Sequence, residues 1–84
     1  MKLIVNRRRC MCINVENIKG LQIGTHPNSG KPVIAAGMQM EDDVIIGTYE
    51  TREEAEKAFF SLMWDLEHKD ICYINQSTAD NAPA

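Results

Sequence analysis

The sequence predicts an α+β domain, in which an antiparallel sheet of about five to six strands, connected as a meander, is packed by one C-terminal amphipathic helix. Short aliphatic runs separated by turn residues fill the chain up to residue 49, and a helical stripe of apolar residues follows them. A length of 84 residues with 44% apolar composition suits one small domain. We expect this domain over residues 1–75 and a flexible tail, small, polar and proline-containing, over residues 76–84.

Five runs in the first part of the chain have the composition of strands, and turn residues bound each of them. These runs cover residues 2–5, 10–15, 18–25, 33–40 and 44–49. The segment between the third and fourth runs, residues 26–32, contains two prolines, an asparagine and a glycine, and therefore predicts a hairpin loop. Shorter turns are predicted over residues 6–9, 16–17 and 41–43, and a short last strand over residues 71–74.

The helix has the clearest local signal in the chain. Residues 51–54, T-R-E-E, form a capping box, in which the hydroxyl of Thr51 and a Glu carboxylate satisfy free N–H groups of the first turn. We expect the helix to run from about Arg52 to Lys69. A core-facing stripe at i, i+3, i+4 spacing consists of Ala55, Ala58, Phe59, Leu62, Met63 and Leu66.

Two large aromatic residues lie off this stripe. At 100° per residue measured from Ala55, the stripe is centred near about 20°, Phe60 falls at about 140° and Trp64 at about 180°. Aromatic rings on a wet helix face indicate a protein contact, most simply self-association as a homodimer or higher oligomer. The alternative is that the helix is rotated, or that a loop or Tyr73 covers the pair.

The three cysteines, Cys10, Cys12 and Cys72, cannot form a fully paired disulfide framework. Cys10 and Cys12 share one face if both lie on a strand, and we expect them to be small buried hydrophobes. A zinc site needs more ligands at close spacing, and the two histidines, His26 and His68, are distant in the sequence. We therefore expect no metal site.

Charge is distributed unevenly along the chain. Residues 1–31 hold six basic residues and one acidic residue, net +5, whereas residues 32–84 hold three basic and eleven acidic residues, net −8. The run Arg7, Arg8 and Arg9 lies between two predicted strands, and guanidinium groups are preferred partners of phosphate and carboxylate. The run predicts either an anion site, a contact with an acidic protein surface, or a solvated turn. Duplex nucleic acid is excluded as a partner by the net charge of −3 and the shortness of the run.

A second candidate contact for an anion is Lys31, which follows Ser29 and Gly30 in the predicted hairpin loop. The segment lacks the first glycine of a P-loop and opens no helix, so it predicts no nucleoside triphosphate site. At most, we expect the backbone N–H groups of this loop and Lys31 to lie at the edge of an anion pocket that forms in a dimer.

Enzyme chemistry has little support in this sequence. The candidate acid or base groups are Asp42, Asp43, His26 and Tyr49. Their spacing does not pair a nucleophile with a base. We therefore expect no enzymatic activity and no cofactor. The apolar run Leu3-Ile4-Val5 is too short for a signal peptide or a membrane span, so we expect a cytoplasmic protein without a membrane partner.

Two segments carry a resemblance to a known group of proteins. Residues 12–18, C-I-N-V-E-N-I, contain an I-N-x-[DE]-N-I turn, and residues 45–55, I-I-G-T-Y-E-T-R-E-E-A, contain I-x-G-x-Y followed by T-x-E-E-A. Over roughly residues 1–75 the chain resembles small uncharacterised proteins from prophages and mobile elements of Gram-positive bacteria. Their motifs are structural and carry no catalytic residues. The resemblance implies a context in which many proteins of this size antagonise host defence.

These observations together predict a non-enzymatic binding protein. The leading hypothesis is an oligomer that sequesters a small anionic, nucleotide-type signal of host defence, with Arg7, Arg8, Arg9 and Lys31 neutralising its phosphates. The alternative is an inhibitor that blocks a host defence protein, such as a nuclease effector, through its acidic half or through Phe60 and Trp64.

Overall fold

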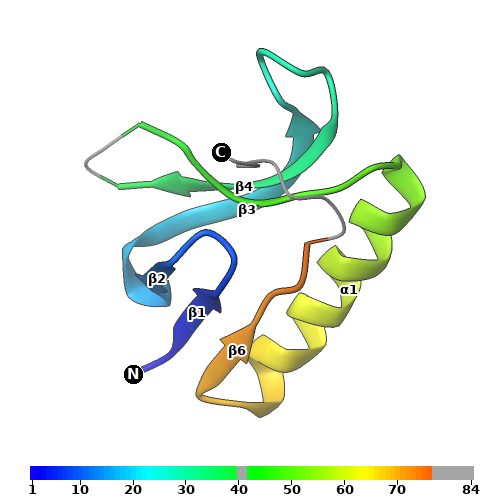
Figure 1. Ribbon diagram of the computed structural model, residues 1–84. Coiled ribbons are helices and arrows are strands. Elements are labelled where there is room, and N and C mark those ends of the chain that lie inside the picture. Colours follow the sequence, from blue (N-terminus) through cyan, green and yellow to red (C-terminus); the bar gives the residue numbers. More distant parts are fainter. Residues whose placement is uncertain (40–41, 77–84) are drawn as a thin grey trace.

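The computed structural model describes residues 1–39 and 42–76, which form two three-stranded sheets and one helix (Figure 1). The first sheet has the order β2 (Met11–Asn14), β1 (Leu3–Asn6) and β6 (Ile71–Tyr73). The second has the order β3 (Ile18–Thr25), β4 (Pro32–Met38) and β5 (Val44–Thr48). The α+β class is therefore confirmed. Residues 40–41 of the expected fourth strand and turn, and residues 77–84 of the expected tail, lie outside the described residues.

The expectation of one continuous meander is wrong, because the chain leaves the first sheet after two strands. β1 and β2 pair as an antiparallel hairpin, and β6 then pairs with the other edge of β1 in parallel, with Leu3 opposite Ile71. A 3-10 turn, η1 (Val15–Asn17), follows β2 and is capped by the Asn14 side chain, which accepts from the Glu16 N–H at 2.9 Å. This turn directs the next strand into the second sheet.

The second sheet is an antiparallel meander of the predicted kind. β3 pairs with β4 from Ile18 to Thr25, and β4 pairs with β5. The predicted hairpin loop joins β3 to β4, where the His26 N–H donates to the Lys31 carbonyl at 2.8 Å. Gly30 has φ 76° in this loop, a left-handed conformation that favours glycine.

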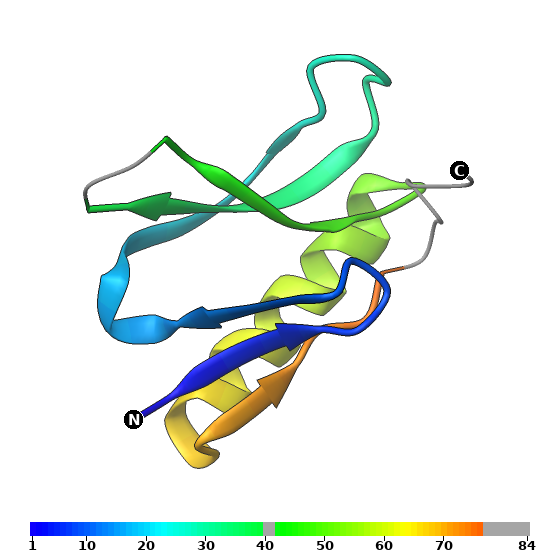
Figure 2. The same ribbon diagram turned by 60° about the vertical axis from the view of Figure 1, so that its left-hand side comes forward.

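The helix α1 (Arg52–His68) begins and ends close to the predicted residues. The hydroxyl of Thr51 accepts a hydrogen bond from the Glu54 N–H at 3.1 Å, which confirms Thr51 as the N-cap. Of the predicted stripe, Ala55 and Leu62 are buried, and Ala58, Phe59 and Leu66 are partly buried against the core. The helix contacts β3, β4 and β6, so it packs against both sheets (Figure 2).

The core lies between the two sheets and the helix. Its most buried large side chains include Ile4 of β1, Ile34 of β4, Ile46 of β5 and Tyr49, which immediately follows β5. Two polar side chains, Asn6 and Thr48, are equally buried. Because Asn6 immediately precedes the arginine run, its buried bonds determine where the arginines lie.

The expectation that Cys10 and Cys12 are buried is wrong, since both are exposed. Cys10 lies in the turn after β1 with φ 54°, outside any strand. Ile4 and Ile13 are partners in the β1–β2 register and face the core, so the next pair, Val5 and Cys12, faces outward. Cys72 of β6 is buried.

Candidate anion-binding site

The turn that carries the three arginines is built on the side chain of Asn6. This residue is fully buried, and its Oδ1 accepts from the N–H of Arg8 at 3.0 Å and from the N–H of Arg9 at 3.3 Å. The turn closes where the Cys10 N–H donates to the Arg7 carbonyl at 3.2 Å. An asparagine that accepts from the backbone two and three residues further on is a recurrent turn device. The backbone of the arginine run is therefore held in a defined conformation.

The amide of Asn6 also connects this turn to distant parts of the chain. Its Nδ2 donates to the carbonyl of Ile46 in β5 at 2.6 Å and to Oε1 of Gln76 at 2.9 Å. Gln76 is only 5% exposed, so this residue does not belong to a frayed tail as the sequence analysis expected. The turn and the segment after β6 are thereby fixed side by side.

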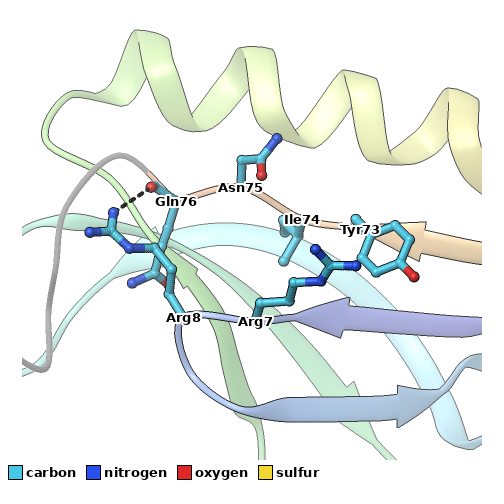
Figure 3. Close-up of a pocket in the computed structure, with 6 residues that line it drawn as sticks. All are labelled: Arg7, Arg8, Tyr73, Ile74, Asn75 and Gln76. Atoms are coloured by element: carbon cyan, nitrogen blue, oxygen red, sulfur yellow. Dashed lines mark hydrogen bonds between the residues drawn. The ribbon is translucent and has the colours of Figure 1, made fainter.

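A pocket of about 190 Å³ lies between the turn and this segment (Figure 3). The residues that line it are Arg7, Arg8, Tyr73, Ile74, Asn75 and Gln76. The guanidinium of Arg7 lies over the Tyr73 ring, 4.7 Å from its centroid. Nη1 of Arg8 donates to the Gln76 carbonyl at 3.2 Å. Each arginine is thus oriented by one partner on the opposite wall.

The electrostatics of this pocket favour an anion. Two guanidinium groups line it, and no carboxylate is among its described lining residues. Arg8 uses one of its five N–H donors on Gln76, which leaves other donors for a ligand. The exposed amide of Asn75 adds a further hydrogen-bonding group. Phosphate and carboxylate match guanidinium geometry because they accept two parallel hydrogen bonds.

Arg9 and Lys31, the other two predicted ligand-binding residues, do not line this pocket. Arg9 takes part in the turn through its N–H. Lys31 is in the β3–β4 loop of the second sheet, where its Nζ forms an ion pair with Glu50 at 3.2 Å. The structure therefore brings together Arg7 and Arg8, whereas the alternation of an extended strand would have paired Arg7 with Arg9. The difference arises because the run is a turn.

The predicted contact residues on the helix are exposed. Phe60 is 67% exposed and Trp64 is 54% exposed, and the alternative that a loop or Tyr73 covers them is wrong. The Trp64 ring stacks on the His68 ring with a centroid distance of 3.9 Å and an interplanar angle of 13°. Neither aromatic residue lines the arginine pocket.

Sequence reasoning missed four residues of the pocket as site residues: Tyr73, Ile74, Asn75 and Gln76. Tyr73 belonged to a predicted short strand, and no local pattern indicated that this strand pairs with β1. That pairing places Tyr73 opposite Val5, two residues before Arg7. No local pattern marked Asn75 and Gln76 as site residues, since the expected domain ended at residue 75 and the expected tail began at residue 76.

Comparisons with protein-family models, curated proteins and solved structures find no match for this chain. Within residues 1–39 and 42–76, no helix is long and apolar enough to cross a membrane. The same part of the chain contains no group of three or more His, Cys, Asp or Glu side chains that could hold a metal ion.

Proposed function

We propose that this is a non-enzymatic binding protein for a small anionic, nucleotide-type ligand, and that Arg7 and Arg8 hold the ligand's phosphate. One observation carries the proposal: two guanidinium groups line one pocket to which the described chain contributes no carboxylate. Clefts lined by one sign of charge concentrate ligands of the opposite sign. The protein's net charge of −3 makes this local positive charge selective for small anions over nucleic acid duplexes.

The size of the pocket limits what it holds. Pockets for whole small-molecule ligands measure about 300–1,000 Å³, whereas this one measures about 190 Å³. It therefore suits one ionic group, and the rest of a nucleotide must lie against a surface beyond it. In this proposal the protein also self-associates through Phe60 and Trp64, which are more than half exposed.

The biological role that we propose is sequestration. The resemblance to prophage and mobile-element proteins suggests an antagonist of host defence, and a nucleotide immune signal has the chemistry that the arginine pocket suits. A protein that only binds such a signal lowers its free concentration without any chemical step. This role requires no catalytic residue.

A thermal-shift screen with cyclic dinucleotides and ADP-ribose derivatives tests the proposed function. A ligand that binds only the folded protein stabilises it by RT ln(1 + [L]/Kd), about 2.7 kcal/mol at a concentration of one hundred times Kd. We expect at least one compound to raise the melting temperature of the wild-type protein and to lose this effect with the Arg7→Gln/Arg8→Gln variant. Equal shifts for both proteins, or none for any compound, would argue against the arginine site.

A second candidate function is direct inhibition of a host defence protein. The observation in its favour is the exposed pair Phe60 and Trp64 on a helix whose outer side also carries exposed Glu53, Glu56 and Glu67. Exposed aromatic residues with charged neighbours are typical of protein contact sites. A pure protein inhibitor of this kind gives no nucleotide-dependent stabilisation, so the same screen distinguishes the two functions.

A further inference from the structure

The face of the first sheet that points away from the core is mainly apolar. In the register of β1 with β2 and β6, Ile4 lies opposite Ile13 and Cys72, and all three are buried. The residues before and after them on each strand therefore point outward. Apart from Asn14, the residues of this outer sheet face are Leu3, Val5, Cys12, Ile71 and Tyr73. A sheet face in contact with water is normally polar, so the composition of this one indicates a covering partner.

The side chains of the outer sheet face are accessible to such a partner. Ile71 is 47% exposed and Tyr73 is 50% exposed. Leu3 and Val5 are half-buried, and neither belongs to the apolar residues that form the core or pack against it. Covering this face would remove apolar surface of several residues from water, which favours association.

The charge around the outer sheet face is positive at one end. β1, β2 and β6 contain no charged residue. The arginine run follows β1 directly, and the guanidinium of Arg7 lies over the Tyr73 ring of this face (Figure 3). The opposite end borders on exposed Glu16 and Asp70, but the segment 1–31 that supplies β1 and β2 has a net charge of +5. An apolar surface bordered by carboxylates complements this combination.

The outer face of α1 has that composition. Phe60 and Trp64 are more than half exposed on it. At 100° per residue, the other exposed residues between about 100° and 200° from Ala55 are Glu53, Glu56, Lys57 and Glu67. Two aromatic rings thus lie among three carboxylates and one ammonium group. At physiological salt the attraction of these carboxylates to a basic surface acts over about 8 Å, so it requires no ion pair with the guanidinium groups of the pocket.

We propose that the protein associates head to tail, with the outer face of α1 of one copy packed on the outer sheet face of the next. The inference rests on the proposed function, from which it takes the self-association through Phe60 and Trp64, and it adds the surface that these rings contact. Because the two contacting surfaces differ, each copy keeps one free surface of each kind, and assembly continues into a ring or a chain. Tyr73 belongs both to the outer sheet face and to the arginine pocket, so the neighbouring copy would also border that pocket.

The test is to mix two variants that each lack one of the two surfaces. Phe60→Gln/Trp64→Gln removes the helix surface, and Leu3→Thr/Ile71→Glu removes the sheet surface. We expect each variant alone to sediment as a monomer and an equimolar mixture to sediment as a dimer of about twice the monomer mass, because one competent pair of surfaces remains. Thr25→Glu adds the same charge at an exposed strand position of the second sheet and should assemble like wild type.

Far-ultraviolet circular dichroism checks that the variants are folded. If Leu3→Thr/Ile71→Glu is not, Leu3→Thr/Ile71→Thr takes its place, because threonine suits a strand. An oligomeric sheet variant beside a monomeric helix variant would overturn the head-to-tail contact and leave self-association through the helix standing. Two monomeric variants that form no dimer when mixed would overturn it as well. A monomeric wild type would instead contradict the self-association on which the inference rests.

Discussion

The side chain of Asn6 donates a hydrogen bond from Nδ2 to Oε1 of Gln76 at 2.9 Å, across 70 residues of sequence. The bond joins the turn that carries Arg7 and Arg8 to the segment that forms the opposite wall of their pocket. Both residues are buried, so water does not compete for it. The geometry of the candidate site therefore depends on a residue that does not line it.

The first prediction concerns this connection. Asn6→Ala removes the buried donor to two acceptor groups, the Ile46 carbonyl and Oε1 of Gln76. Each such group costs roughly 1–3 kcal/mol, so we expect a loss of about 3 kcal/mol in the free energy of unfolding, measured in urea. Asn75→Ala, which removes an exposed amide nearby, should change it by less than about 0.5 kcal/mol. If Asn6→Ala lowers the free energy of unfolding no more than this control does, the hydrogen bonds of Asn6 do not hold the turn.

The second prediction concerns the start of α1. Thr51→Ala removes the hydroxyl that accepts from the Glu54 N–H and should cost about 1 kcal/mol of stability. Ser61→Ala removes a hydroxyl from an exposed position in the middle of the same helix and serves as the matched control. We expect no loss of stability there, because alanine favours a helix interior. If urea denaturation gives the same result for both variants, the cap contributes nothing measurable.

The third prediction concerns the exposed aromatic residues. Replacing both Phe60 and Trp64 with glutamine should leave the protein folded, because both side chains are more than half exposed. If these rings form the contact between copies, sedimentation velocity should show an oligomer for wild type and a monomer for the double variant. Persistence of the oligomer in the variant would place the contact elsewhere on the surface.

The fourth prediction concerns pH. Burial raises the pKa of Tyr49 from 10.0 to about 12. The folded state retains the Tyr49 proton more strongly than the unfolded chain does. The contribution of this proton to the stability of the fold is therefore complete below about pH 10 and decreases as the pH rises toward about 12. Between those two pH values the free energy of unfolding should fall by roughly 2 kcal/mol more in wild type than in Tyr49→Phe.

Urea unfolding of the two proteins at about pH 9 and about pH 12 measures this difference. Burial also raises the pKa of the Cys72 thiol, but this group is present in both proteins and its effect cancels in the comparison. Parallel losses of stability in wild type and variant would show that the Tyr49 hydroxyl is not held in its protonated form by burial.

Local sequence patterns predicted the local structure well. The Thr51 cap and the apolar spacing after it correctly located a helix that begins at Arg52, and the loop residues from His26 to Pro32 correctly located a hairpin. These elements depend on contacts between near neighbours, for which spacing and turn chemistry are sufficient information. The exposure of Phe60 and Trp64 followed from the same helical geometry.

The division into two sheets could not be predicted in this way. It depends on the parallel pairing of β1 with β6, in which Leu3 lies opposite Ile71. Alternation within a strand shows which side chains share a face, but it does not identify the partner strand. Since Tyr73, Asn75 and Gln76 reach the arginine pocket only through this pairing, the sequence indicated the cationic half of the candidate site and not its opposite wall.

The central claim is that Arg7 and Arg8 form an anion site, and calorimetric titration of inorganic pyrophosphate at low salt tests it most directly. Wild type, Arg7→Gln/Arg8→Gln and Lys31→Gln should be compared, since Lys31 is a cation of the same basic segment that lies outside the pocket. Each charge-assisted hydrogen bond contributes about 1.5–3 kcal/mol. The arginine variant should therefore bind at least tenfold more weakly than wild type, and Lys31→Gln should bind like wild type. Equal affinities for all three proteins, or no binding by wild type, would contradict the claim.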